Sequence, residues 1–205
     1  MAYKFAVQRE VTELHKWCFG ILLKVQEKLN NYFTFDIRLI GSGDKRLVTK
    51  DSNDCFDLDY NLILQRDKQD LIDNPKKIKE LFINAFNSIL NNALENYTHV
   101  CDSTSVITVK IIDQNIRKFS FDVAILVEGN DGFFYRLTND KKTGRYIWNQ
   151  VPSSKNYFKK FQEIKRQGYW EDFKKKYLKL KNLHENDHNV KSFSVFLETL
   201  NQFYQ

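Results

Sequence analysis

The seven residues 56–62, FDLDYNL, alternate apolar and polar side chains. A period of two predicts a half-buried strand, on which Asp57 and Asp59 point to one face while Leu58 and Tyr60 point to the other. Two neighbouring carboxylates repel each other unless a proton or a cation lies between them, and hard divalent cations such as Mg²⁺ bind carboxylate oxygens. The segment therefore indicates either a metal site or an acidic pair on a solvated sheet face.

Asp122 lies in a second alternating segment, residues 119–127, whose sequence is FSFDVAILV. Phe119 and Phe121 point to one face of this predicted strand, and Asp122 points to the other. A carboxylate in the middle of so apolar a strand is costly unless it is paired or binds a metal. If this strand lies beside residues 56–62, three carboxylates converge, which is enough for the two cations of a phosphoryl-transfer site.

The glycine-rich sequence Gly41-Ser42-Gly43 follows a third alternating segment, residues 35–39. Glycine directly after a strand allows backbone N–H groups to approach phosphate oxygens, and the Ser42 hydroxyl adds a hydrogen-bond donor. A plain tight turn is the alternative interpretation of the same three residues. A P-loop is excluded as a motif, because GxxxxGK[ST] does not occur in the chain.

Three segments together, residues 40–42 (IGS), 56–60 (FDLDY) and 121–123 (FDV), resemble the signature of the polymerase-beta-type nucleotidyltransferase superfamily. The resemblance extends in element order over roughly residues 8–128. It is closest to the branch of cyclic GMP–AMP synthase, oligoadenylate synthetase and the bacterial cyclic-oligonucleotide synthases, where a long N-terminal helix precedes the Gly-Ser strand. The spacing departs slightly from the compact motif, because fourteen residues separate the serine from the first aspartate of the pair.

The resemblance implies an enzyme that moves a nucleotidyl group from an NTP, such as ATP, to a hydroxyl acceptor and releases pyrophosphate. Gly41 and Ser42 would bind the triphosphate, Asp57 and Asp59 would hold two Mg²⁺ ions, for which Mn²⁺ is a substitute, and Asp122 would complete the ion that activates the attacking hydroxyl. The acceptor stays open between a second nucleotide, an RNA 3′ end, a protein hydroxyl and a small molecule. A catalytically silent nucleotide-binding or regulatory module of the same fold is the alternative function.

Basic charge is concentrated in the last quarter of the chain. The whole sequence has 32 Lys and Arg against 26 Asp and Glu, a net charge of +6, and residues 155–205 supply most of this excess. In the resembled families a lysine of the C-terminal helices reaches the outer phosphates. The resemblance implies that one of the lysines on the predicted helix 170–180 and just after it has this nucleotide-binding role, without saying which: Lys174, Lys175, Lys176, Lys179 or Lys181. We favour Lys175 and Lys179, which lie four residues apart on one helical face; a solvated helix face is the alternative.

Hydrophobic periodicity predicts an α+β protein with a polymerase-beta-like core, a mixed sheet with flanking helices, followed by C-terminal helices. We expect residues 1–151 to form the nucleotidyltransferase core, including the N-terminal helix, and residues 152–205 to form a helical part packed on it. The predicted elements are helices over 7–29 and 75–94, strands over 35–39, 56–62, 106–112 and 119–127, a hairpin of 133–137 with 146–148, and helices over 157–164, 170–180 and 193–203.

The stretch His184-Glu185-Asn186-Asp187-His188 matches HExxH, which binds zinc when it lies on a helix. Asn and Asp residues surround it, and these residues favour caps and turns over helix interiors. We therefore predict a loop between two helices instead of a zinc protease site.

Composition excludes several other classes of protein. The longest charge-free stretch near the N-terminus, Trp17 to Leu23, is shorter than the roughly 20 residues of a membrane span, and the first residues do not resemble a secretory signal. Cys18, Cys55 and Cys101 include no CxxC pair, so we expect buried, reduced thiols. A soluble, cytoplasmic protein without a membrane partner is expected.

Overall fold

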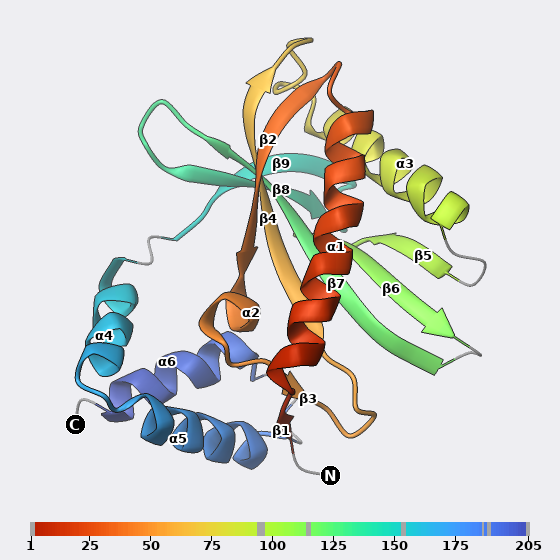
Figure 1. Cartoon of the computed structure of the whole chain (residues 1–205). Coiled ribbons are helices and arrows are strands. Elements are labelled where there is room, and N and C mark those ends of the chain that lie inside the picture. The colour runs from red at the N-terminus through yellow and green to blue at the C-terminus, as the bar shows by residue number, and fades with distance from the viewer. Residues whose placement is uncertain are drawn as a thin grey trace.

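The computed structural model describes residues 3–93, 97–113, 116–152, 155–185, 187 and 190–203. Helices and strands both occur in the first three quarters of the chain, which end with five consecutive strands, and only helices follow (Figure 1). The elements are β1 (Lys4–Phe5), α1 (Gln8–Lys28), β2 (Phe33–Ile40), α2 (Gly41–Lys45), β3 (Thr49–Lys50), β4 (Asp57–Asp67), α3 (Pro75–Ala93), β5 (Tyr97–Asp102), β6 (Ile107–Asp113), β7 (Ile116–Glu128), β8 (Phe134–Asp140), β9 (Arg145–Gln150), α4 (Lys155–Arg166), α5 (Trp170–Leu183) and α6 (Ser192–Phe203).

Seven strands form one mixed sheet in the order β2-β4-β7-β6-β5, with β8 paired to β7 and β9 paired to β8. Strands β4 and β7 are parallel, and every other pairing in this sheet is antiparallel. The connection from β4 to β7 passes through α3, β5 and β6, which leaves the two strands adjacent although about 60 residues separate them. The predicted α+β class, with a mixed sheet, flanking helices and C-terminal helices, is confirmed.

Helices α1 and α3 cover one face of the sheet, because each carries an apolar stripe at helical spacing. Leu14 and Val25 of α1 are buried, as are Phe82 and Phe86 of α3. These side chains join Phe121 of β7 in one hydrophobic cluster. Helix α3 begins at Pro75, where the predicted helix 75–94 begins, and residue 94 of that prediction lies outside the described residues.

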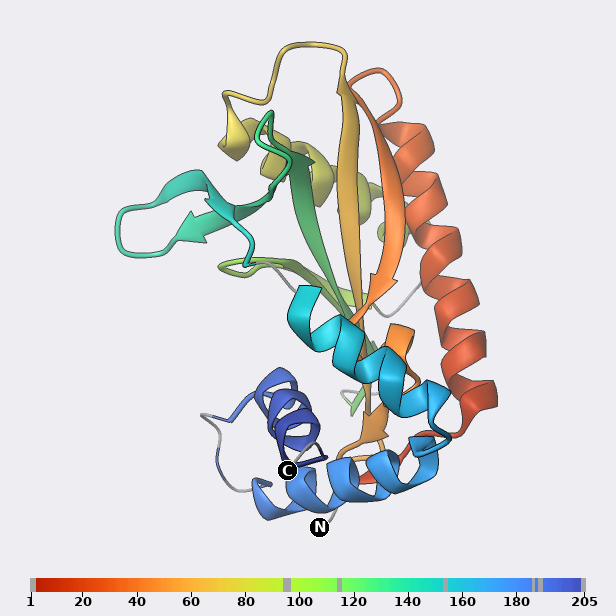
Figure 2. The same cartoon turned by 90° about the vertical axis from the view of Figure 1, so that its left-hand side faces the viewer.

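Helices α4, α5 and α6 form a second hydrophobic cluster below the end of the sheet (Figure 2). The ring of Phe161 packs against Phe173 and Phe196 with centroid distances of 5.8 and 5.3 Å, in edge-to-face geometry. Leu47, which follows α2 in the chain, is 1% exposed within this cluster. The segment after the Gly-Ser sequence therefore anchors the C-terminal helices to the sheet.

The N-terminal strand β1 also contacts the C-terminal helices. It pairs with β3, and the backbone N–H of Tyr3 donates to Asn182 Oδ1 of α5 at 2.5 Å. Asn182 Nδ2 donates in return to the Tyr3 carbonyl at 3.2 Å. Two ends of the sequence are therefore joined beside the second cluster.

Four short elements escape the sequence prediction, namely β1, α2, β3 and β5. Strands β1 and β3 have two residues each and pair across a wide separation in sequence, so no local periodicity reveals them. The Gly-rich segment forms the helical turn α2, where its composition predicts either a phosphate-binding backbone or a plain turn.

Cys18 and Cys55 are buried, as predicted, whereas Cys101 is half-buried. In the described residues, no helix is both long enough and apolar enough to span a bilayer.

Candidate active site

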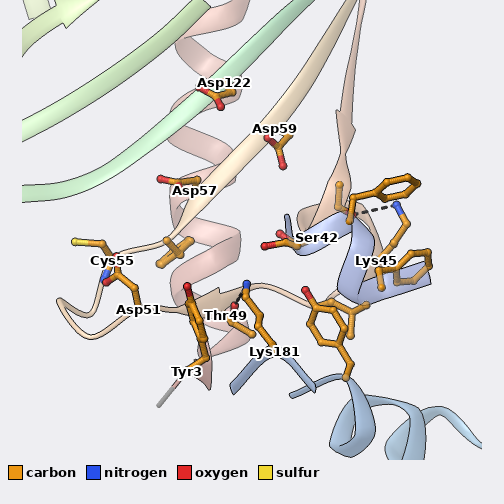
Figure 3. A pocket seen from close by; sticks show the side chains of 17 residues that line it. Tyr3, Ser42, Lys45, Thr49, Asp51, Cys55, Asp57, Asp59, Asp122 and Lys181 are labelled. Atoms are coloured by element: carbon orange, nitrogen blue, oxygen red, sulfur yellow. Dashed lines mark hydrogen bonds between the residues drawn. The ribbon is translucent and has the colours of Figure 1, made fainter. Parts of the chain in front are cut away.

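A cavity of about 350 Å³ lies where the carboxylate-bearing ends of β4 and β7 meet α2 and the C-terminal helices (Figure 3). This volume falls within the range of sites for small molecules. The lining residues come from both ends of the chain: Tyr3, Gly41, Ser42, Lys45, Leu47, Thr49, Asp51, Cys55, Phe56, Asp57, Asp59, Asp122, Tyr177, Lys181, Ser192, Phe193 and Phe196.

The parallel pairing of β4 with β7 brings the three predicted carboxylates into this cavity. Asp59 is the register partner of Asp122, and Asp57 is the partner of Ser120. Side chains two residues apart on a strand share a face, so all three aspartates project from the same side of the sheet (Figure 3). Ser120 Oγ donates a hydrogen bond to Asp57 Oδ1, and Thr108 Oγ1 donates to Asp122 Oδ1 at 2.7 Å.

Burial and mutual repulsion change the acidity of these groups. Burial, followed by the negative charges of Asp122 and Asp57, raises the pKa of Asp59 to about 6, although Lys45 and Arg136 act in the opposite direction. The pKa of Asp122 is also raised, mainly by burial, while the hydrogen bond from Thr108 opposes the shift. The cavity therefore holds a concentration of negative charge that a bound cation would stabilise.

The donor chemistry of the three aspartates fits Mg²⁺ or Mn²⁺, since these ions take carboxylate oxygens. Among the residues that the structure describes, no three His, Cys, Asp or Glu side chains are already arranged around one point to hold an ion. Like charges without a cation between them repel, so small side-chain rotations would accompany ion binding.

Gly41 brings the backbone into direct contact with Asp59. Its φ of +65° lies in the left-handed region, and a Cβ atom at this position would lie 2.5 Å from Asp59 Oδ2. Only glycine fits at so close an approach. Ser42 follows on the cavity wall, and Lys45, one helical turn later, donates from Nζ to the Gly41 carbonyl at 3.2 Å. The Gly-Ser sequence thus forms a helical turn against the carboxylates instead of a solvent-exposed loop.

Lys181 is the lysine of the C-terminal helices that reaches the cavity. Its Nζ donates to Thr49 Oγ1 at 2.5 Å and lies 4.5 Å from the ring centroid of Tyr3. Burial lowers its pKa to about 8, although Asp57 and Asp51 act in the opposite direction. In Figure 3 its side chain points from α5 toward the carboxylates.

The two lysines favoured from the sequence do not line this cavity. Lys175 is exposed and lies 3.5 Å from Asp172 on the same helix, and Lys179 is exposed as well. Lys181 was among the five lysines left open from the sequence but was not the favoured one, although it lies four residues after Tyr177 and so continues the buried stripe of α5. Lys175 and Lys179 lie off that stripe. The sequence did not predict that Lys45 lines the cavity, because its side chain reaches the cavity wall only when residues 41–45 form the helical turn α2.

Aromatic side chains form the wall opposite the carboxylates. Tyr177 and Phe196 are buried, and Phe193 is 50% exposed. Phe193 stacks on Phe196 with a centroid distance of 6.2 Å and an interplanar angle of 22°. Flat apolar surfaces of this kind accommodate a planar ring.

The HExxH stretch follows the prediction where it is described. Helix α5 ends at Leu183, and His184 and Glu185 form a turn beyond it. His184 Nε2 lies 3.1 Å from Glu198 Oε2 of α6, so this histidine joins two helices. His188 and Asn186 lie outside the described residues.

No family model matches the sequence, and no curated protein sequence matches it. Solved structures do match the fold. The Vibrio cholerae DncV cyclic AMP-GMP synthase in complex with the linear intermediate 5′ pppA(3′,5′)pG has a TM-score of 0.70 at 11% identity, over 96% of this chain and 67% of that chain. A DncV structure described as a prokaryotic cGAS homolog gives 0.67 at 11%, over 96% and 67%. The 3′-deoxy ATP bound form of DncV gives 0.58 at 14%, over 82% and 45%.

The architecture is therefore that of the polymerase-beta-type nucleotidyltransferases, and the resemblance predicted from the sequence is confirmed at the level of the fold. Within this class the chain has the form seen in DncV, a bacterial cGAS-like dinucleotide cyclase, and it spans about two thirds of the length of that protein.

Proposed function

We propose that this protein is a Mg²⁺-dependent nucleotidyltransferase that transfers a nucleotidyl group from an NTP to a hydroxyl acceptor and releases pyrophosphate. The observation that carries the proposal is the register of β4 with β7, which pairs Asp59 with Asp122 in the wall of a cavity that Gly41 and Ser42 also line. Two-metal sites for phosphoryl transfer combine carboxylates in this way. The structural similarity to DncV, a cyclic AMP-GMP synthase, supports the same reaction class.

The residues of the cavity divide into four proposed roles, the first two of which concern the metal ions and the triphosphate. Asp57, Asp59 and Asp122 would hold two divalent cations, which supply charge neutralisation and a more acidic acceptor hydroxyl. The backbone and hydroxyl of Gly41 and Ser42 would orient the triphosphate as hydrogen-bond donors.

Two lysines extend this phosphate site. Lys45 and Lys181 would neutralise the outer phosphates, since both ammonium groups border the cavity and neither lies on the solvated face of its helix. The aromatic wall at Phe193 would receive the nucleobase, because this residue lines the cavity and is half exposed. These assignments replace Lys175 and Lys179 in the phosphate-binding role.

Two hydrophobic clusters support the proposed division of the chain at residues 151 and 152. One cluster joins the sheet to helices α1 and α3, and the other joins α4, α5 and α6. Phe5 and Leu47 belong to the second cluster although they precede the division in sequence. We therefore propose two structural parts that share one cavity.

The decisive experiment is incubation of the protein with each labelled NTP and Mg²⁺ or Mn²⁺, followed by measurement of pyrophosphate and by mass analysis of the product. We expect the wild-type protein to release pyrophosphate and the Asp122→Asn variant to release none. The product mass identifies the acceptor among a second nucleotide, an RNA end, a protein hydroxyl and a small molecule. NTP binding without turnover, with every acceptor class supplied, would favour the silent nucleotide-binding module instead.

A further inference from the structure

A chain of hydroxyl groups leads from the candidate carboxylates away from the cavity. Thr108 of β6 is the register partner of Asp122, and its Oγ1 donates to Asp122 Oδ1 at 2.7 Å. Ser103 Oγ lies 3.1 Å from Thr108 Oγ1, within hydrogen-bonding distance. Both contacts lie on the face of the sheet that bears the candidate site.

The direction of these hydrogen bonds follows from the chemistry of the groups. An ionised carboxylate only accepts hydrogen bonds, and a hydroxyl has a single hydrogen to donate. Because Thr108 donates to Asp122, the contact between Ser103 and Thr108 requires Ser103 as the donor. The order is therefore Ser103 to Thr108 to Asp122.

The far end of this chain is fixed by a buried lysine. Lys79 of α3 has a side chain that is 2% exposed, and its Nζ lies 3.3 Å from Asp102 Oδ1. The same ammonium donates to the carbonyls of Val106, at 3.0 Å, and Ser103, at 3.5 Å. The turn between β5 and β6 is thereby held from inside the protein, and Ser103 is held with it.

Resting on the proposed function, we infer that Thr108 is a positioning residue for Asp122: it occupies Oδ1 and thereby presents Oδ2 to the metal and the acceptor hydroxyl. Within the described part of the chain, Asp122 Oδ2 makes no hydrogen bond. A carboxylate with one oxygen held by a second residue binds a cation with fewer rotamers to lose. Ser103 has a supporting role, because it fixes the direction of the Thr108 hydroxyl.

Three substitutions separate this role from simple packing. Thr108→Val keeps the shape and removes the hydroxyl, Thr108→Ser keeps the hydroxyl and removes the methyl group, and Ser103→Ala removes only the outer donor. Thr138→Val is the matched control, since Thr138 lies on β8 and donates to the Ile147 carbonyl at 3.3 Å, outside the cavity. Thermal unfolding reports the integrity of each variant.

The first measurement is the affinity for Mn²⁺, monitored by electron paramagnetic resonance in the presence of a non-hydrolysable NTP analogue. We expect Thr108→Val to weaken Mn²⁺ binding about 10-fold, as removal of partners of metal ligands generally does. Thr108→Ser and Thr138→Val should stay within about twofold of wild type, and Ser103→Ala should lose about threefold. In turnover assays kcat should fall with Mn²⁺ affinity, while KM for the NTP at saturating metal stays unchanged.

Thr108→Val with wild-type Mn²⁺ affinity and kcat would overturn the inference, as would a Thr108→Ser variant as impaired as Thr108→Val. If Thr108→Val does not fold, Ser103→Ala decides in its place, and wild-type behaviour of that variant overturns the inference. A wild-type protein that neither binds Mn²⁺ nor turns over an NTP refutes the proposed function itself. An active wild type beside an unaffected Thr108→Val refutes only the positioning role.

Discussion

The two faces of strand β4 come from alternate residues of one segment and differ in almost every physical respect. Leu58 and Tyr60 lie under α1 and α3 and are 0% and 1% exposed. Asp57 and Asp59 point into the cavity on the other face, where the pKa of Asp59 is raised to about 6 by burial and by neighbouring carboxylates. The apolar face gains free energy from burial, whereas the acidic face costs free energy until a cation arrives. Substitutions one residue apart should therefore have opposite consequences.

The largest effect should come from the acidic face. Asp57→Asn, Asp59→Asn and Asp122→Asn should each lower turnover by at least ~10³-fold, about 4 kcal/mol in the barrier, because each removes a proposed metal ligand. Removal of like charge should leave the free energy of unfolding level or raise it. Turnover assays beside urea unfolding measure both quantities. Near-wild-type turnover in any one variant would remove that residue from the proposed site.

The apolar face should show the reverse. Leu58→Ala should lower the free energy of unfolding by about 3 kcal/mol, since it leaves a cavity beneath the helices. Turnover measured well below the unfolding temperature should fall much less than in the aspartate variants. Leu58→Met keeps most of the volume and is the control. A Leu58→Ala variant that is stable but inactive would mean that the two faces are not separable.

The acidity of Asp59 predicts how the stability of the metal-free protein depends on pH. The native state holds this proton to a pKa of about 6, whereas the ordinary pKa of an aspartate is 3.8, so the native state binds more protons between these values. Stability should therefore fall as pH rises through this window, by about 3 kcal/mol. Asp59→Asn should lack this component. The free energy of unfolding is measured against pH for the wild type and for Asp59→Asn, and the difference between the two pH dependences isolates this component. Parallel pH dependences would contradict the raised pKa.

Lys181 should affect substrate binding more than stability. Lys181→Ala should raise KM for the NTP about 10-fold, or 1.4 kcal/mol, whereas Lys175→Ala and Lys179→Ala should not. Because its pKa is lowered to about 8, the free enzyme loses this cation above that pH and kcat/KM should decline. Lys181→Arg should move the decline to higher pH. If the decline of kcat/KM at high pH is unchanged in Lys181→Arg, the decline belongs to another titrating group.

The smallest effect is expected at His184, which lies away from both faces of β4. His184→Ala removes a partly exposed pair with Glu198, which should cost less than about 1 kcal/mol of stability. Turnover should stay at the wild-type level, and metal analysis of the purified protein should find no zinc that depends on His184. Stoichiometric zinc that this substitution removes would contradict the loop assignment. His188→Ala gives the parallel measurement at the other histidine.

Local periodicity accounts for most of what the sequence predicts correctly. Alternation places Asp57 and Asp59 on one face of β4, and the apolar neighbours of Asp122 mark it as exceptional before any pairing is known. The sheet then brings these residues together in the parallel register of β4 with β7. Both strands had a clear period of two, so only their adjacency had to be inferred.

The lysines of the site depend on long-range packing, and for that reason the sequence did not identify them. Five lysines lie between residues 174 and 181 of α5, and their spacing alone does not say which one faces the cavity. The docking of Leu47 and Phe5 against α5 fixes the rotation of the helix. Thr108 was equally hidden, since a threonine in a strand is ordinary until its register partner is known.

The joining of both ends of the chain at the cavity has a consequence for the newly made protein. Tyr3 and Phe196 line the same space, and Leu47 is buried in the cluster that includes residues of α4, α5 and α6. During synthesis the sheet emerges first, with its acidic edge and the anchoring leucine open to water. A nucleotide would gain its full set of contacts only after α6 leaves the ribosome, so ligand binding would stabilise chains that include α6 and not the shorter ones that precede them.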